Sequence, residues 1–223
     1  MSKHDHPGTG SATGRRGLLV GAVALLVGAA AAGVFLFDGG EVGPGEAPNP
    51  LASTDAPMLG EPGAKVHIVE FLDPACETCA MFYPYVKQLI ARNPGRIRLS
   101  LRHVPFHEGS EYAVRLLEAS RAQDKYWQTL ETLLASQAMW APNHVVRAEL
   151  VNQAVSGVGL DMDRLAADMN SPEVIRRAEQ DLGDAMALKI RATPEYFVNG
   201  RPLPSFGWQQ LESLVAEELA KAY

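Results

Sequence analysis

Residues 17–37 form the longest apolar stretch of the chain and contain only Gly, Ala, Val, Leu and Phe. At about 1.5 Å per residue, a helix of this length spans roughly 30 Å, the hydrocarbon thickness of a bilayer. Arg15 and Arg16 precede the stretch and Asp38 follows it, so the N-terminal side is expected in the cytoplasm. The pattern predicts a cytoplasmic segment at 1–16 and a transmembrane signal-anchor at 17–37.

A candidate cleavage site lies within this predicted span, and a linker follows it. Ala30-Ala31-Ala32 offers a small-residue cleavage site, but cutting there would leave the apolar residues 34–37 at the new N-terminus, so an uncleaved anchor is favoured over a cleaved signal peptide. Residues 38–57 are rich in Gly and Pro without apolar periodicity, which is typical of a flexible linker. The remaining chain, 58–223, is long enough for one well-buried domain.

The spacing of apolar positions changes along this domain. Residues 65–72 are almost continuously apolar, as in a buried strand, whereas residues 96–104 alternate, as in a strand with one covered face. Between them, residues 79–92 carry apolar side chains at helical spacing and end at Asn93-Pro94-Gly95. A strand, a helix and a strand joined by short turns predict a right-handed βαβ unit.

No convincing strand pattern occurs in residues 111–190. The rest of the chain predicts two short strands around an Asn199-Gly200 turn and then a closing amphipathic helix. An α/β domain with a helical insertion at about 110–190 is therefore expected, with helices on both faces of its sheet. The expected helices are 110–122, 124–136, 143–156, 161–169, 172–190 and 208–223, and the two strands are 196–198 and 201–203.

Cys76 and Cys79 are the only cysteines in the chain, and they flank Glu77-Thr78 directly after the first predicted strand. A CxxC at a strand-to-helix junction is typical of a redox dithiol, because the N–H groups of the helix start stabilise a thiolate on the first cysteine. A structural disulfide is a weaker interpretation because so small a ring constrains the unfolded chain little. Tetrahedral zinc would need two further ligands.

The residues around this motif carry a family resemblance. The chain reads E-F-L-D-P-A-C-E-T-C at 70–79 and T-P-E-Y-F-V-N-G at 193–200, and with the long helical stretch between them it resembles the DsbA-type branch of the thioredoxin superfamily. The resemblance implies a thioredoxin fold over about 58–223. It also implies that Glu70 is the buried acid that shuttles protons, that Pro84 kinks the active-site helix, and that Pro194 is the cis-proline beside the disulfide.

Roles for these residues follow from the chemistry of exchange. Cys76 at the helix start is expected to attack and Cys79, one turn inside, to resolve the mixed disulfide. If Glu70 is buried, desolvation raises its pKa toward neutrality so that it can exchange a proton with Cys79; the alternative is a strand glutamate that faces outward. The backbone of Thr193, before Pro194, is expected to pair with a client peptide.

The dipeptide Glu77-Thr78 is neither the Pro-His of strong oxidases nor the Gly-Pro of thioredoxins, so oxidase, reductase and isomerase directions stay open. A carboxylate next to Cys76 opposes the thiolate. The attacking cysteine has a pKa of about 7 in thioredoxin and of about 3.5 in the strong oxidase. The pKa of Cys76 is therefore expected nearer the thioredoxin figure.

Net charge and composition limit the classes of molecule that the protein is expected to bind. The formal net charge is −6 and no basic tract occurs, which makes nucleic acid a poor partner. We expect cysteine-containing secreted or envelope proteins as clients, a membrane redox partner, no cofactor, and a catalytic domain on the extracytoplasmic side of the cell membrane. The alternative is a copper(I)-binding module, because two thiolates suit a soft ion.

Other polar and aromatic residues are less specific. His103 and His107 flank Pro105-Phe106 and are expected at the surface or in capping roles rather than facing the site. Met81 is expected in the core of its helix. Three aromatic residues are expected to anchor the core of the helical lobe, namely Tyr126, Trp127 and Trp140.

Overall fold

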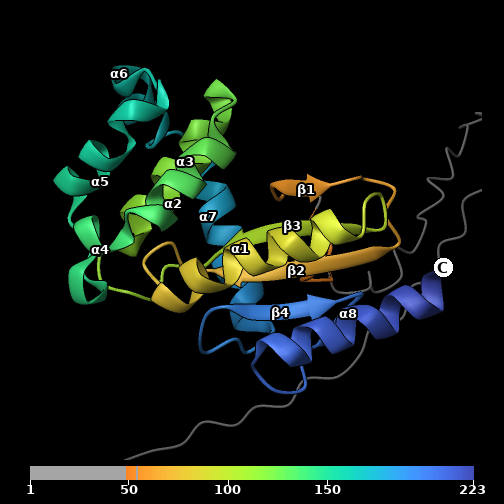
Figure 1. Cartoon of the computed structure of the whole chain (residues 1–223). Coiled ribbons are helices and arrows are strands. Elements are labelled where there is room, and N and C mark those ends of the chain that lie inside the picture. The colour runs from red at the N-terminus through yellow and green to blue at the C-terminus, as the bar shows by residue number, and fades with distance from the viewer. Residues whose placement is uncertain (1–48, 54) are drawn as a thin grey trace, which may run out of the picture. The chain divides into compact units, whose positions relative to one another are not determined.

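The computed structural model describes residues 49–53 and 55–223 (Figure 1). The predicted span at 17–37 lies outside these residues. Within the described part of the chain, no helix is both long and apolar enough to cross a membrane.

Five strands form one mixed sheet in the order β1-β3-β2-β4-β5. The central pair β2 and β3 is parallel, and β1, β4 and β5 each join antiparallel. The strand–helix–strand unit expected from the apolar spacing is therefore present with the parallel pairing that it requires. The strands are β1 (Met58–Gly60), β2 (Val66–Leu72), β3 (Ile97–His103), β4 (Glu195–Val198) and β5 (Arg201–Pro202).

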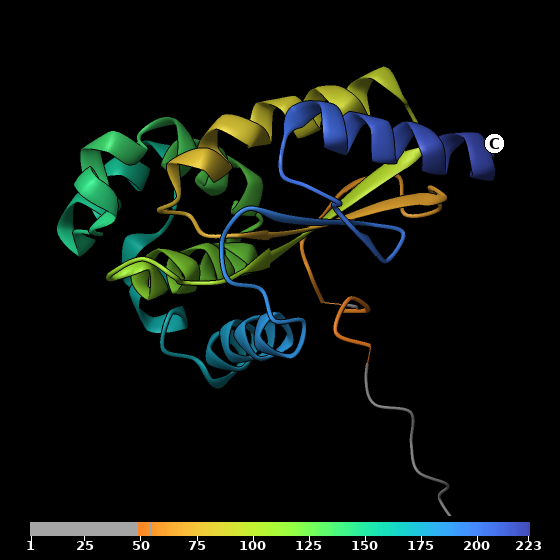
Figure 2. The same ribbon diagram turned by 90° about the horizontal axis from the view of Figure 1, so that it is seen from below.

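In residues 55–223, six helices lie in the insertion between β3 and β4, and the other two, Glu77–Arg92 and Trp208–Ala222, pack on one face of the sheet (Figure 2). The insertion also contains short 3₁₀ turns at Arg121–Gln123, Pro142–His144 and Ser156–Val158. The helices are α1 (Glu77–Arg92), α2 (Ser110–Ser120), α3 (Tyr126–Ala135), α4 (Gln137–Trp140), α5 (Ala148–Val155), α6 (Met162–Asp168), α7 (Pro172–Ala187) and α8 (Trp208–Ala222).

Both faces of the sheet are covered. Figure 2 shows α1 and α8 on one face and α7 on the opposite face. Because side chains alternate along a strand, Ile68 and Leu72 of β2 join the large core with α1 and α8, while Phe71 joins a smaller core with α7. Glu70 shares the parity of Ile68 and Leu72, so its side chain is buried toward α1.

Several predicted boundaries are close to the observed ones. Ser171 caps α7 by accepting from the Val174 N–H at 3.3 Å, and Pro172 occupies the first turn. Asn199 and Gly200 both have positive φ values, 48° and 80°, as a tight hairpin turn between β4 and β5 requires. Trp140 and Tyr126 are buried core residues of the lobe, as expected.

One strand was not predicted, and two local expectations were wrong. Strand β1 was not predicted, because it is three residues long and its pairing with Arg98–Ser100 of β3 is a non-local contact. The helix expected to begin at residue 143 begins at Ala148, because Asn143 and His144 adopt positive φ values of 54° and 62°. Met81 is 61% exposed, because it lies on the outer side of α1.

A buried cation joins the sheet to α7. Arg102 of β3 is fully buried and donates to the carboxylates of Asp181 and Asp184, the latter at 2.5 Å. Asp181 also accepts from the backbone N–H of His103 at 2.8 Å. Burial raises the pKa of Asp181, and the charge of Arg102 opposes that rise. The ion pair therefore stabilises α7 against the sheet only while both partners are present.

The segment before β1 also contacts this part of the fold. The carbonyl of Pro50 accepts from Arg102 at 3.0 Å, and Leu51 packs against the smaller core. Asp55 forms ion pairs with Arg121 of the first 3₁₀ turn and Arg177 of α7, at 3.0 and 2.7 Å. The end of the stretch expected to serve as a linker thus lies on the domain.

We predict that Arg102→Ala lowers the free energy of unfolding by about 3–5 kcal/mol, because it leaves two carboxylates without their buried cation. Arg92→Ala is the matched control, since Arg92 is 55% exposed in its surface pair with Glu212 and should change stability by about 0.5 kcal/mol at most. Urea unfolding of the full-length chain in detergent measures both. Equal losses in the two variants would contradict the assigned role of Arg102.

Candidate active site

The CxxC lies at the turn between β2 and α1. Cys76 is the N-cap of α1, with φ −82° and ψ 115°, and its Sγ accepts a hydrogen bond from the Cys79 N–H at 3.4 Å. Both cysteines are free thiols. The extended backbone at residue 76 leaves the N–H groups of the first helical turn pointing toward Sγ, which is the geometry that favours a thiolate.

A second segment meets the CxxC from the far end of the chain. The Thr193–Pro194 peptide bond is cis, as predicted. The Cys76 thiol donates to the Thr193 carbonyl oxygen at 3.3 Å. Thr193, Pro194 and the two cysteines are therefore brought together just ahead of β4.

The two thiols have opposite properties. A hydrogen bond from the Cys79 thiol is the main reason that the pKa of Cys76 is lowered to about 5, with further help from the Thr193 side chain and from the N–H groups of Cys79 and Thr78; burial opposes this. For Cys79 itself, burial is the main cause that raises the pKa well above its ordinary value, followed by the hydrogen bond to Cys76 and then the charge on Cys76. Near neutral pH, Cys76 is a thiolate and Cys79 a thiol.

Glu77 does not have the effect expected from its position. Its side chain is exposed, and it is not among the largest causes of the pKa shift of Cys76. That pKa of about 5 lies below the expected figure, because hydrogen bonds at the helix start outweigh an exposed, solvent-screened carboxylate. Thr78 contributes its backbone N–H to the thiolate site.

Glu70 is completely buried beneath the CxxC, so the outward-facing alternative was wrong. Its Oε1 accepts from the Tyr196 hydroxyl at 3.0 Å, whereas its Oε2 has no hydrogen-bond partner in the part of the chain that the structure describes. Burial raises the pKa of Glu70 to about 8; the Tyr196 hydrogen bond opposes this rise and the charge of Cys76 adds to it. A carboxyl with such a pKa can both accept and donate a proton near neutral pH.

Asp73, which was not predicted as a site residue, organises the turn before Cys76. Its fully buried carboxylate accepts from the N–H groups of Ala75, Phe106 and His107, from the His107 ring at 2.7 Å, and from the Ser110 hydroxyl. Its backbone oxygen accepts from the Cys76 N–H at 3.0 Å. An Asp side chain often accepts a hydrogen bond from the backbone N–H two residues later, as Asp73 does from Ala75. That local signal could have suggested this role.

The helical lobe contacts the same turn. Gln137 of α4 donates to the Pro74 carbonyl at 2.6 Å, and the Nδ1 of His144 lies 3.3 Å from the Ala75 carbonyl. The His144 ring also stacks on His107, with centroids 4.8 Å apart. No sequence pattern marks these residues, because each contact joins segments more than thirty residues apart.

His103 does not belong to the site. It is fully buried rather than at the surface, and its Nε2 shares a hydrogen bond with the Tyr126 hydroxyl at 2.7 Å. Burial lowers its pKa to about 4. His103 is therefore a neutral core residue between β3 and the lobe.

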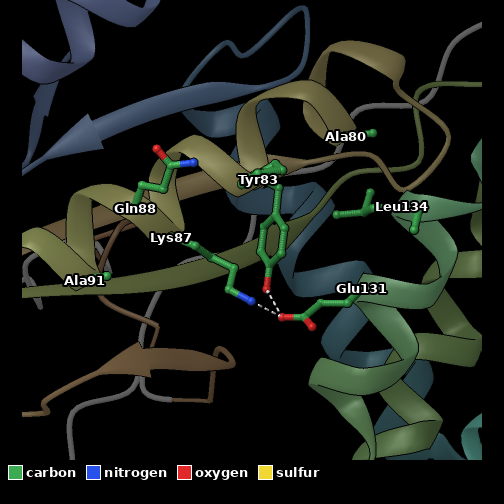
Figure 3. A pocket seen from close by; sticks show the side chains of 9 residues that line it. Ala80, Tyr83, Lys87, Gln88, Ala91, Glu131 and Leu134 are labelled. Carbon is green, nitrogen blue, oxygen red and sulfur yellow. Dashed lines mark hydrogen bonds and ion pairs between the residues drawn. The ribbon is translucent and has the colours of Figure 1, made fainter.

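A cavity of about 480 Å³ lies between α1 and α3. Figure 3 shows Tyr83 and Lys87 reaching from α1 to the Glu131 carboxylate of α3, at 3.2 and 2.6 Å. Pro84 also lines it, and as a proline inside α1 it leaves the Ala80 carbonyl without its usual helical donor. Residues 49–53 and 55–223 contain no group of three or more His, Cys, Asp or Glu side chains arranged to hold a metal ion.

Comparison with known proteins agrees with this geometry. The family model described as thioredoxin matches residues 52–217. A thioredoxin-like oxidoreductase from Silicibacter pomeroyi DSS-3 is 30% identical, with a TM-score of 0.66 over 78% of this chain and 98% of that one. The α-DsbA1 structure from Wolbachia pipientis shares the fold at 19% identity, with a TM-score of 0.66 over 77% of this chain and 94% of that one.

Two curated proteins are also similar. Disulfide bond formation protein D of Bacillus subtilis is 25% identical over 170 residues, 73% of this chain and 77% of that protein. The Na(+)/H(+) antiporter NhaA of Herminiimonas arsenicoxydans is 34% identical over 146 residues, 66% of this chain and 22% of the antiporter. The chain thus spans about a fifth of the length of the curated antiporters that it matches. The matched family model and the shared fold together show that the chain belongs to the thioredoxin family.

Proposed function

We propose that the protein is a membrane-tethered oxidoreductase that exchanges disulfides with cysteines of secreted or envelope proteins through Cys76 and Cys79. The observation that carries the proposal is the asymmetry between the two thiols, since the pKa of Cys76 is lowered to about 5 while that of buried Cys79 is raised. Exchange needs one thiolate that attacks and one thiol held back to resolve.

In the first step, the Cys76 thiolate attacks a sulfur of a client disulfide. The Cys76–client disulfide bond forms, the client S–S bond breaks, and the departing client thiolate takes a proton from water. In the second step, Cys79 gives its proton to Glu70 and attacks Cys76. The Cys76–Cys79 bond forms and the second client thiolate leaves, so the client is reduced and the enzyme oxidised; run backward, the same steps oxidise the client.

Thr193 and Pro194 are proposed to hold the client peptide. The proposal is supported by the position of the Thr193 carbonyl, 3.3 Å from the Cys76 sulfur. A peptide that pairs with this backbone in an extended conformation would carry its cysteine to the attacking thiolate. Backbone pairing reads little of the client sequence, which suits an enzyme with many clients.

Anchoring is proposed from the sequence. Residues 17–37 are long and apolar enough to span a bilayer, and the arginines before them favour a cytoplasmic N-terminus. The catalytic domain, 58–223, would then lie on the periplasmic or extracellular face, joined by the linker 38–57. A membrane redox partner would restore the Cys76–Cys79 pair to the oxidation state that it had before each turnover. The reduction potential of this pair, measured against glutathione, decides the direction of electron flow.

We predict that Cys76→Ser abolishes exchange with a disulfide-containing peptide, whereas Cys79→Ser attacks normally and accumulates a covalent mixed disulfide. The physical reason is that only Cys76 has a lowered pKa. Non-reducing electrophoresis detects the trapped complex. Equal trapping by the two variants would contradict the assignment of attacking and resolving thiols.

The exposed position of Glu77 generates a second prediction. Glu77→Gln should lower the pKa of Cys76 by about half a unit or less, because it removes a nearby but solvent-screened negative charge. Thiolate absorbance followed against pH measures this, and the difference should vanish in concentrated salt. A shift above one unit would mean that Glu77 acts directly on the sulfur.

Membrane tethering is tested by fractionation. The full-length chain should stay with membranes after an alkaline wash, while a chain without residues 1–37 should be released. Protease added to the outer face should digest the catalytic domain of the full-length protein. Release of the intact domain by signal cleavage in the cell would contradict the uncleaved anchor.

A further inference from the structure

Glu70 has one satisfied and one free oxygen. Tyr196 donates its hydroxyl to Oε1 at 3.0 Å, and Oε2 has no partner among the described residues. Both side chains are fully buried. A buried carboxyl oxygen without a partner is costly and uncommon, so its presence beside a reactive dithiol calls for a functional reason.

The position of the hydroxyl follows from strand pairing. Glu70 of β2 and Tyr196 of β4 are direct partners in the antiparallel ladder, and their side chains emerge on the same face, toward α1. Phe82 of α1 stacks on the Tyr196 ring, with centroids 6.1 Å apart. The register and this packing hold the hydroxyl at one oxygen of the carboxyl.

The other groups that face Glu70 are few. From α1 come the two cysteines and, at longer range, the Tyr83 hydroxyl. On β3 the partner residue is Leu101, and α8 contributes Leu211 and Leu214 to this core. In the part of the chain that the structure describes, no cation pairs with Glu70, and Tyr196 is its hydrogen-bond donor.

We infer that Tyr196 is a positioning residue for the resolving step, in which its hydroxyl holds Oε1 and leaves Oε2 to take the proton of Cys79. The inference rests on the proposed function. The Cys79 S–H bond breaks and an Oε2–H bond forms; the Cys79 thiolate then attacks Cys76, and the client thiolate leaves. No further reactant is required, and in the reverse direction Glu70 returns the same proton.

The hydroxyl also keeps Glu70 usable as a base. Burial favours the protonated acid, while the donated hydrogen bond favours the carboxylate. In the mixed disulfide Cys76 carries no charge, so the pKa of Glu70 there lies below the value of about 8 that it has in the dithiol enzyme. Without the Tyr196 hydroxyl, burial alone acts and the pKa must rise.

Two phases of one reaction separate attack from resolution. The reduced full-length chain is mixed with an aromatic disulfide whose released thiolate is coloured; Cys76 releases the first thiolate and Cys79 the second. In Tyr196→Phe, the first phase should keep its rate. The second should slow about tenfold at neutral pH, with its midpoint about one pH unit higher, because a hydrogen bond to a charged group is lost.

Three variants act as controls. Tyr126→Phe removes another buried hydroxyl, one bonded to His103 rather than to Glu70, and should leave both phases unchanged. Glu70→Gln should remove the pH-dependent rise of the second phase. In that background, Tyr196→Phe should have no further effect on the second phase, since its effect passes through Glu70.

The outcomes are distinguishable. If the wild-type chain showed no first phase, the proposed function would be overturned and this inference with it. A normal first phase with an unmoved second-phase midpoint in Tyr196→Phe would overturn the inference alone, as would slowing of equal size in the Glu70→Gln background. Should the Phe variant fold poorly, Tyr196→Met fills the site without a hydroxyl and must give the same upward shift.

Discussion

The turn that joins β2 to α1 is the constraint on which the site depends, and the buried Asp73 carboxylate holds it. That carboxylate gathers hydrogen bonds from Ala75 on one side and from the loop after β3 on the other, and the Asp73 carbonyl accepts from Cys76. Because the turn is fixed at both ends, Cys76 stays at the N-cap with its sulfur over the first N–H groups of α1. The hydrogen bond from the Cys79 thiol is the main cause of the lowered pKa of Cys76, and the N–H groups that this placement brings to the sulfur lower it further.

Three groups that can become negatively charged lie close together on the α1 side of the sheet. Cys76, Cys79 and Glu70 can each carry a negative charge, and burial penalises the charge on the last two. They cannot all be ionised together at low cost, so near neutral pH the charge lies on Cys76 while Cys79 and Glu70 each hold a proton. The difference in pKa between the two thiols and the proton held by Glu70 are therefore two results of one buried cluster.

Local patterns predicted the parts of this arrangement that depend on neighbours in sequence. Apolar spacing located β2, α1 and β3, and the position of Cys76 at a strand-to-helix junction predicted that the pKa of its thiol is lowered. What escaped prediction depends on contacts across the fold: the three residues of β1 pair only because β3 is beside them, and His144 reaches Ala75 through a positive φ that nothing in its own segment requires. Glu77 failed as a guide for a related reason, because its sequence position next to Cys76 does not specify that its side chain is exposed.

The helical insertion is part of the redox site in this arrangement. Gln137 and His144 both contact the carbonyls of the turn before Cys76, and His107, which bonds Asp73, stacks on His144. On the other side of α1, Tyr83 and Lys87 meet Glu131 of α3. A displacement of the lobe against the sheet would therefore move the turn at the N-terminus of α1. The lengths and angles of the hydrogen bonds to the Cys76 sulfur depend on the position of that turn. The lobe therefore helps to fix the position of the turn that carries Cys76, although none of these lobe residues bonds to the sulfur itself.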